Sequence, residues 1–464
     1  MRKFFANLKN NKFFKGAIIL AIAGIICRGI GVAFRIPLAN IVGNYGIGLY
    51  QLVFPLYSFL LIVSSSGIPV AISRMVARAH NDNDKVKAKQ ILFNAVLLLT
   101  VIGLLITVLF FVFSGTIARA QGNESIGSVY MAIAPSVVLV CVMSALRGYF
   151  QGYQNMTPTA VSQIIEQLIK LGAGLGLAAL WIKKSVEMAV FGSILAVSIS
   201  ELIALIYLVF HYLKHKKKED AGAKPQKTKF KPDLKIVKEI IKTALPITAM
   251  ASIFPLLLMF DSMVVVNMLS AAGESGRTAT ELYGISSGAV HTLTNLPSVI
   301  SVAVATCIVP MATSHFHKGE FKEMQKKSVF AILAVLVMSA ASAIIYFFFA
   351  DFILNLLYSG AFKDRAEQFD IAVKLLKIES ILVVFMCLTQ VLSSILQGVG
   401  KLKIPLFALL AGGVAKVLIE IFFIKTDLGI NAVSFANIAC FLVALLVNLI
   451  FVIITFNHYK KNNN

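Results

Sequence analysis

The segment GIICRGIGVAFRIPLAN, residues 24–40, places two arginines inside a stretch that is otherwise apolar. It belongs to an apolar run near residues 15–38, which is long enough to cross a hydrocarbon core of about 30 Å. An arginine at the centre of a bilayer costs about 2.5–3.5 kcal/mol on insertion scales, so it needs either a partner or water. The segment therefore predicts a membrane helix with charged side chains near its middle.

The composition of the whole chain supports the same interpretation. Of its 464 residues, 58% are hydrophobic and only 14% are charged, whereas an ordinary soluble domain is about 25% charged. The basic N-terminal segment MRKFFANLKNNKFFK precedes an apolar run that is too long for a signal peptide. We therefore expect this segment to stay attached to the first membrane helix of a multi-pass protein in the cell (plasma) membrane.

Apolar runs of sufficient length recur along the chain and predict an all-α membrane protein with about twelve transmembrane helices. The expected spans lie near residues 15–38, 46–72, 88–113, 126–150, 158–182, 186–213, 237–268, 281–312, 325–350, 369–398, 402–425 and 430–457. Most of the 43 Lys and Arg residues fall on one set of alternating connections. Because cytoplasmic loops collect basic residues, we expect both termini to be cytoplasmic. The same bias accounts for the net charge of +21 without a nucleic-acid partner.

The longest basic connection divides the predicted helices into six and six. We expect residues 1–213 to form an N-terminal six-helix lobe, residues 214–236 a basic cytoplasmic linker, and residues 237–464 a C-terminal six-helix lobe. A single chain of this design can work alone, so we expect a monomer.

The two predicted lobes look like repeats of one another. The pairs Gln151-Gly152 and Gln397-Gly398 lie 246 residues apart, and so do Lys170 and Lys416. Matches at one offset indicate an internal duplication. Two like halves related by an axis along the membrane normal are a known transporter plan, with substrate bound between them near the midplane.

Prolines inside the spans offer positions for bending. Each proline removes an intrahelical hydrogen bond and can kink the helix. The strongest candidates as hinges are the paired prolines of the second and eighth spans: Pro55, Pro69, Pro297 and Pro310. The alternative is that these prolines form static kinks.

Arg28 and Arg35 are the candidate substrate-binding residues. They are seven residues apart, so they lie on the same face of a helix. They could be held in a buried ion pair with an acidic partner, or Arg35 could simply reach the outer interface. Alternatively, they could face a water-filled cavity that attracts an anionic substrate. Guanidinium offers a permanently charged bidentate fork that suits phosphate oxygens.

Other charged or titratable residues inside the spans are candidates for lining the cavity or for ion coupling. They are Asp261, His291, Lys170, Lys416, Glu166 and Glu420. Glu166 with Lys170, and Lys416 with Glu420, are spaced so that each pair can neutralise itself on one helix face. Asp261 has no basic neighbour in sequence, so it pairs with an arginine of the other lobe or binds a cation such as Na⁺ or H⁺.

Signatures of enzymatic chemistry are missing from the sequence. There is no Walker A loop, no nucleophile elbow and no HExxH motif. The five cysteines lack metal-ligand spacing. We therefore expect no catalytic residues, no resident metal and no cofactor. Any transport would be driven by an Na⁺ or H⁺ gradient or by the membrane potential.

Several stretches resemble a known family. NYGIGLYQLVFPLYSFLLIVSSSGIPVAISRMVARAHNDND (44–84) and ELYGISSGAVHTLTNLPSVISVAVATCIVPMAT (281–313) are similar to the polysaccharide-transporter branch of the MOP (multidrug/oligosaccharidyl-lipid/polysaccharide) exporter superfamily. LLYSGAF, followed by LQGVGKLKIP, adds to the resemblance. Within that branch, the stage V sporulation protein B and MurJ-like lipid II flippase group is the most similar.

The resemblance implies a V-shaped pair of six-helix lobes with a central cavity that opens alternately to each side. It also implies a cargo: a sugar linked to undecaprenyl pyrophosphate, such as lipid II, carried to the outer leaflet for peptidoglycan, cell-wall or polysaccharide biosynthesis, in growth or sporulation. Arginines of the first span are associated with the diphosphate in lipid II flippases. CRGIGVAFRIPLAN matches that region, with Arg28 in register and Arg35 one residue further along.

Two alternatives remain open from the sequence. A cation-coupled multidrug antiporter of the same superfamily would favour carboxylates in its cavity, which Asp261 fits and the two arginines do not. A membrane scaffold for wall or spore-coat assembly would gain nothing from charges in the middle of a span.

Overall fold

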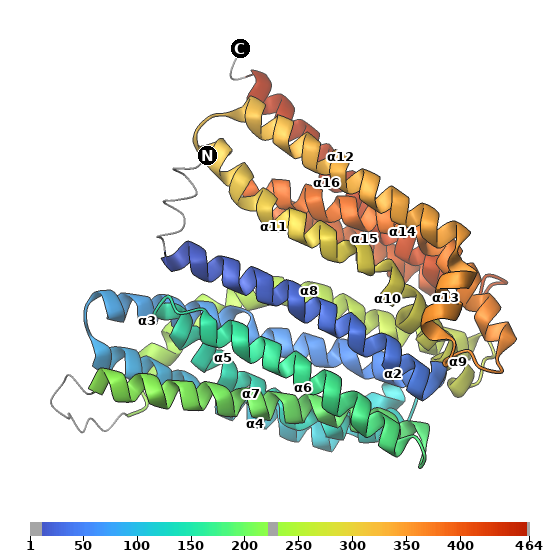
Figure 1. The fold of residues 1–464 in the computed structure, drawn as a ribbon, viewed down its shortest axis with the longest axis horizontal. Helices are drawn as coiled ribbons and strands as arrows, with labels where there is room; N and C mark the ends of the chain where they lie inside the picture. The colour runs from blue at the N-terminus through green and yellow to red at the C-terminus, as the bar shows by residue number, and fades with distance from the viewer. Residues whose placement is uncertain (1–11, 221–230, 462–464) are drawn as a thin grey trace. The chain divides into compact units, whose positions relative to one another are not determined.

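The computed structural model of the protein describes residues 12–220 and 231–461, and every regular element in these ranges is helical (Figure 1). The elements are α2 Lys12–Ser65, α3 Gly67–Asn81, α4 Lys85–Ala120, α5 Ile126–Gly152, α6 Thr157–Trp181, α7 Val186–Asp220, α8 Leu234–Ala271, α9 Gly276–Tyr283, the π-helix η1 Gly284–Val290, α10 His291–Thr294, α11 Leu296–His317, α12 Phe321–Phe348, α13 Ala350–Tyr358, α14 Ala366–Gly398, α15 Lys403–Phe423 and α16 Asn431–Lys461. The expected all-α architecture is confirmed.

Ten helical segments of the described residues are long and apolar enough to cross a membrane. One of them, Ile22–Asn81, covers most of the first expected span and all of the second, and α14 coincides with the tenth expected span. The order of the twelve expected spans is therefore reproduced. The chain is a multi-pass membrane protein.

The first two expected spans are joined by a break at a single glycine. Gly43 has φ 68° and ψ −176°, and helical geometry continues on both sides of it. A positive φ is accessible to glycine at little cost, so the chain changes direction there without an intervening loop. Hydropathy predicted a short connection between the two spans in this region. It could not show that a single glycine takes the place of that connection.

The eighth expected span, residues 281–312, is not one helix. It is built from α9, the π-helix η1, the short α10 and then α11, which begins at Leu296. A π-helical turn inserts an extra residue relative to an α-helix and is often found where a helix serves a function. The structure thus corrects the expectation of a continuous helix.

The four hinge candidates occupy different positions in their helices. Pro55 lies within α2 and Pro310 within α11. Pro69 lies in the first turn of α3, and Pro297 stands at the start of α11. A proline in a first turn removes no intrahelical hydrogen bond, because those N–H groups have no partner in the helix. Their role as hinges stays a prediction.

The described chain forms two compact units, which we treat separately. Unit 1 comprises residues up to Phe34, Val53–Ala120 and Glu124–Met259; unit 2 comprises Arg35–Leu52, Gln121–Asn123 and Phe260 onward. Helix α2 thus leaves unit 1 after Phe34 and returns to it at Val53. Of the predicted linker 214–236, residues 221–230 lie outside the described residues, and α7 continues to Asp220. The lobe boundaries inferred from the sequence stay predictions.

Unit 1 is organised around α5. Helices α3, α4 and α7 pack against it, and α6 packs along α7. Its buried core includes Ile72, Leu99 and Tyr149, all completely or almost completely buried. Small residues allow close approach here: a side chain at Gly148 would collide with the backbone of Pro69.

Unit 2 is organised in a comparable way around α14. Helices α11, α12 and α16 pack against α14, and α15 packs along α16. The backbones of α15 and α16 come very close, because a Cβ atom at Gly412 would lie 2.2 Å from the carbonyl oxygen of Cys440.

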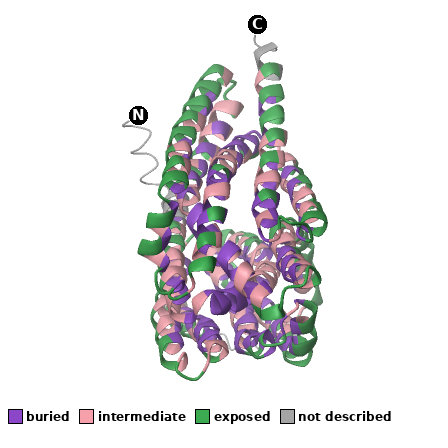
Figure 2. Ribbon diagram, turned by 90° about the vertical axis from the view of Figure 1, so that its right-hand side faces the viewer, coloured by how far each residue is buried: buried purple, intermediate pink, exposed green. Residues whose placement is uncertain are grey.

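Apolar side chains cover the outer faces of the helices. Val112 is 67% exposed, Phe210 65% and Val337 69%. Exposed and buried residues alternate along the outer helices, whereas α5 is buried along most of its length (Figure 2). A protein in water would not leave so many large apolar groups exposed, so these faces contact lipid.

Substituting the glycine of the α15–α16 contact tests this packing. We expect Gly412→Ala to lower the thermal unfolding midpoint, because overpacking a tight contact costs about 1–3 kcal/mol. The matched control is Gly172→Ala in α6, where a Cβ atom would meet nothing within 4 Å. That change should be neutral or stabilising, since alanine favours helix. Fluorescence-detected size exclusion after heating measures both, and equal midpoints for the two variants would contradict the close packing.

Candidate functional site

Arg28 lies on the part of α2 that belongs to unit 1. Its neighbours in the helix are apolar or glycine, and its side chain is exposed. No other described residue forms a salt bridge or hydrogen bond with it. Arg35, two turns further along the same helix, is half-buried and belongs to unit 2. The predicted helical spacing of the two arginines is therefore present.

A second group of charges in unit 1 joins α5 to α6. The guanidinium of Arg147 forms an ion pair with Glu166, and its Nε donates a hydrogen bond to the Ser162 hydroxyl at 3.1 Å. The ammonium of Lys170 lies over the rings of Phe34 and Phe54, 5.2 and 5.1 Å from the ring centroids. A cation over an aromatic face is stabilised by the ring quadrupole.

Arg147 was not among the residues singled out from the sequence. The expected pairing of Glu166 with Lys170, four residues away, stays a prediction. The ion-pair partner that the structure shows for Glu166 is Arg147, which is 19 residues away in the chain. The only sequence signal was an arginine near the end of an apolar span. Such a signal does not reveal which helix supplies the partner.

Unit 1 also contains a deeply buried carboxylate on α7. Glu201 is 5% exposed, and the hydroxyl of Tyr57 donates to its Oε1 at 3.3 Å. Its second oxygen has no hydrogen-bond partner. The carboxylates of Glu166 and Glu201 therefore both face the interior of unit 1.

In unit 2 the main charged cluster lies between α8 and α15. Lys416 Nζ is 2.6 Å from Asp261 Oδ1 and 3.7 Å from Glu420 Oε1. The predicted pairing of Lys416 with Glu420 is present. The expectation that Asp261 pairs with an arginine of the other lobe is wrong, because its partner is Lys416, 155 residues away in the chain and in the same unit.

This triad is buried and its charges do not balance. Glu420 is completely buried, and neither of its oxygens accepts a hydrogen bond. One ammonium faces two carboxylates, so the fully ionised triad carries one net negative charge. Because an unbalanced charge is expensive in an apolar interior, such a site favours uptake of a proton or another cation.

His291 lies apart from this triad in the chain, at the point where η1 ends and α10 begins. It is half-buried, and its Nδ1 has no hydrogen-bond partner. Among the described residues, no group of three or more His, Cys, Asp or Glu side chains could hold a metal ion.

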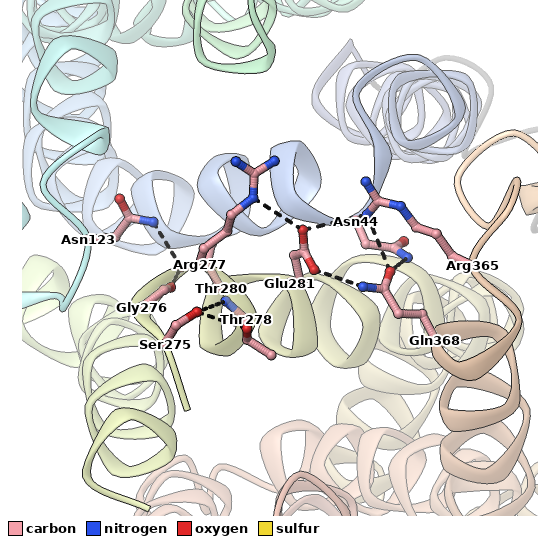
Figure 3. A network of polar contacts seen from close by, with 10 residues as sticks. All are labelled: Asn44, Asn123, Ser275, Gly276, Arg277, Thr278, Thr280, Glu281, Arg365 and Gln368. Atoms are coloured by element: carbon pink, nitrogen blue, oxygen red, sulfur yellow. Dashed lines mark hydrogen bonds and ion pairs between the residues drawn. The ribbon is translucent and has the colours of Figure 1, made fainter. Parts of the chain in front are cut away.

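A polar network in unit 2 links the α2 segment Arg35–Leu52 to α9 and α14 (Figure 3). Asn44 Nδ2 donates to Gln368 Oε1 at 2.8 Å, and Gln368 Nε2 donates to Glu281 Oε2 at 2.8 Å. We call Asn44, Gln368 and Glu281 the clasp. Asn40 adds a neighbouring contact, because its Nδ2 donates to the carbonyl of Leu357 at 2.7 Å.

Glycines bring the backbones together beside the clasp. A Cβ atom at Gly48 would lie 2.1 Å from the carbonyl oxygen of Thr280, and one at Gly284 would lie 2.1 Å from that of Asn44. The hydroxyl of Thr280 also accepts a hydrogen bond from Asn123 Nδ2 at 2.9 Å. The clasp could not be predicted from the sequence. Two of its three members are the uncharged amides Asn44 and Gln368, which form no distinctive sequence pattern.

Comparisons with known proteins agree with this architecture. A sequence model for the family described as polysaccharide biosynthesis protein matches residues 13–316, and one described as MatE matches residues 246–422. The chain is 31% identical over 351 residues to stage V sporulation protein B of Bacillus subtilis, covering 75% of this chain and 67% of that protein.

Two further proteins widen the comparison. The chain is 24% identical over 443 residues to lipid II flippase MurJ of Bacillus subtilis, covering 90% of this chain and 78% of that protein. A multidrug resistance MATE family transporter of the MOP superfamily, solved in an inward-facing conformation, matches with a TM-score of 0.77 at 16% identity. That match covers 97% of this chain and 100% of the other, and it shows the shared fold.

The family match over residues 13–316 and the likeness to stage V sporulation protein B together establish the family. The chain belongs to the polysaccharide biosynthesis protein family, and it is a multi-pass membrane transporter rather than an enzyme.

Proposed function

We propose that this transporter is a flippase for a sugar linked to undecaprenyl pyrophosphate, which it carries from the inner to the outer leaflet of the cell membrane. The cargo would serve peptidoglycan or polysaccharide assembly. The names of two relatives, a lipid II flippase and a sporulation protein, support this class of cargo. Further support comes from the way the protein distributes its charges.

The observation that carries the proposal is the contrast between Arg28 and the carboxylates of the spans. Arg28 is exposed, and its immediate neighbours in α2 are apolar or glycine. Glu201, Asp261, Glu379 and Glu420 are all buried, between 0% and 8% exposed. A guanidinium open to water attracts an anion, and its fork matches phosphate oxygens. A multidrug antiporter for cations would instead need an open carboxylate.

The mechanism follows from this arrangement. The cargo enters from the cytoplasmic leaflet. The positive-inside bias predicts that both chain termini lie on the same side of the membrane. Its pyrophosphate meets Arg28, which replaces part of the water that the anion loses. Movement to the other leaflet then requires a change of conformation, for which the prolines and the glycine break in α2 offer points of bending.

Removing the guanidinium of Arg28 tests the cargo assignment. We expect Arg28→Ala to reduce flipping by at least about tenfold while the protein stays folded, because charge-assisted contacts to the diphosphate are lost. Arg28→Lys should keep part of the activity, since it retains the charge without the fork. The measurement follows a labelled undecaprenyl-pyrophosphate disaccharide-peptide across proteoliposomes.

Arg119→Ala, at the exposed end of α4, is the matched control and should flip normally. Full flipping by Arg28→Ala would refute the role of Arg28. A folded wild-type protein that moves no lipid-linked sugar under any gradient would refute the proposed function and favour the antiporter or scaffold alternatives.

We further propose that the triad of Asp261, Lys416 and Glu420 couples transport to an Na⁺ or H⁺ gradient. Its net negative charge when fully ionised supports uptake of one cation. An imposed membrane potential would add to the driving force, because the site would carry charge within the membrane.

Two variants of the triad should behave differently. Lys416→Ala leaves two buried carboxylates without their ammonium, so we expect it to lower stability by about 3–5 kcal/mol. Glu420→Gln leaves a balanced Asp261–Lys416 pair, so it should cost much less and should remove the response to the coupling gradient. Thermal unfolding measures the first effect, and flipping with Na⁺ and H⁺ gradients applied separately measures the second. If Glu420→Gln responds to gradients as the wild type does, coupling occurs elsewhere.

A further inference from the structure

Two arginines of unit 2 share the carboxylate of Glu281, which is a member of the clasp (Figure 3). Arg277 Nε lies 3.6 Å from Glu281 Oε1, and Arg365 Nη1 lies 3.6 Å from the same oxygen. These two nitrogens are therefore no further apart than twice that distance. The arginine side chains are 63% and 38% exposed, whereas that of Glu281 is only 14% exposed.

The N–H donors of these two guanidinium groups lie too far from the Glu281 carboxylate for close hydrogen bonds. Charge-assisted N–H···O contacts are normally about 2.7–2.9 Å long, well below the 3.6 Å seen here. The other oxygen of Glu281 is already occupied by Gln368 Nε2 at 2.8 Å. Among the described residues, the only other side-chain acceptor for Arg365 is Gln368 Oε1, at 3.4 Å. Two positive charges thus face one negative charge, with donors to spare.

The position of the pair is open to a ligand from water. Neither Arg277 nor Arg365 lies in any of the ten membrane-crossing segments. Arg365 also lines a cavity of about 640 Å³, in which Asn355 and Ser359 add an amide and a hydroxyl. The charges of Lys363 and Arg365 are balanced there by Asp351 and Asp364, so the anion site is defined by the two arginines at Glu281 and not by the charge of the cavity. The sequence places both connections on the outer side, where a flipped cargo would arrive.

We propose that Arg277 and Arg365 form a second anion-binding site, which takes a diphosphate group in place of Glu281. This inference rests on the proposed function for the source of the diphosphate. A diphosphate brings more charge and more acceptor oxygens than one carboxylate, and its two phosphoryl groups can each meet one guanidinium. The ligand would be the diphosphate of the cargo or free inorganic pyrophosphate.

A diphosphate bound at this site would affect the hydrogen bonds of the clasp through Glu281. Glu281 holds Gln368, and Gln368 holds Asn44 in the α2 segment Arg35–Leu52. When a diphosphate competes for the arginines, Glu281 loses its cations and its position is no longer fixed. Arrival of the cargo would thereby loosen the hold of unit 2 on this segment of α2.

Binding of inorganic pyrophosphate to the full-length protein in detergent tests the site directly. The measurement uses isothermal titration calorimetry on the Arg28→Ala protein, so that binding at Arg28 does not contribute. We expect Arg277→Gln and Arg365→Gln each to weaken binding by at least about tenfold. Glu281→Gln should strengthen it by about two- to fivefold, because a competing negative charge is removed.

Charge-matched controls separate a site from a general field. Lys425→Gln removes an exposed cation in the α15–α16 connection, and Glu367→Gln removes an exposed anion in the first turn of α14. Both should leave pyrophosphate affinity unchanged. Equal effects from the controls and the site variants, or no binding to the Arg28→Ala protein, would overturn the proposal.

The source of the diphosphate and the link to the clasp need their own measurements. Undecaprenyl pyrophosphate in the same detergent should bind more tightly than inorganic pyrophosphate if the cargo is the ligand, and equally if the free ion is. Hydrogen–deuterium exchange should show faster exchange in residues 44–52 when pyrophosphate is added. Glu281→Gln should show this faster exchange without ligand, and unchanged exchange in both cases would refute the link.

These results can be told apart from a failure of the proposed function. Pyrophosphate binding in detergent does not require flipping, and it is measured without Arg28. If the protein binds pyrophosphate at Arg277 and Arg365 but flips no lipid-linked sugar, the second site stands and the proposed cargo is wrong. A protein that flips its cargo but binds no pyrophosphate here would lose only the second site.

Discussion

A charge inside an apolar span has to be paired or to face water, and this constraint accounts for where the charged residues of this protein lie. Asp261, Lys416 and Glu420 meet in the interior of unit 2, and Arg147 meets Glu166 in unit 1. The Asp261–Lys416 and Arg147–Glu166 pairs each hold one helix against another, because separation would leave a bare charge in a low-dielectric interior. Arg28 is exposed and has no such partner among the described residues, so the constraint requires that it face water. The interior pairs therefore support the fold, and the exposed arginine is available for a ligand.

Much of the fold was predictable because the bilayer imposes a simple rule on the sequence. A span needs about 20 apolar residues, so the order of helices from α2 to α16 followed from hydropathy. Local backbone geometry did not follow. The break at Gly43 and the π-helix Gly284–Val290 are features of backbone geometry, which hydropathy does not report.

The candidate site was predictable only where partners are close in sequence. The pairing of Lys416 with Glu420 followed from a spacing of four residues on one helix. The contact of Lys416 with Asp261 joins residues 155 positions apart, and that of Arg147 with Glu166 joins two helices. A single sequence contains no information about which helix faces which. The clasp was harder still to find, because Asn44 and Gln368 are uncharged amides more than 300 residues apart in the chain.

The two lysines of the predicted repeat show how duplicated positions can take different roles. Lys416 faces two carboxylates, so its charge is neutralised within unit 2. Lys170 lies over the aromatic faces of Phe34 and Phe54, in the unit that also contains Arg28. Aromatic rings stabilise a cation without cancelling its charge. Unit 1 thus offers the exposed Arg28 to an anionic cargo, while the Asp261–Lys416–Glu420 triad of unit 2 carries one net negative charge when fully ionised, which suits a coupling cation. A transporter that moves an anion with the help of a cation gradient needs both, and divergence of two like halves provides them without any change of fold.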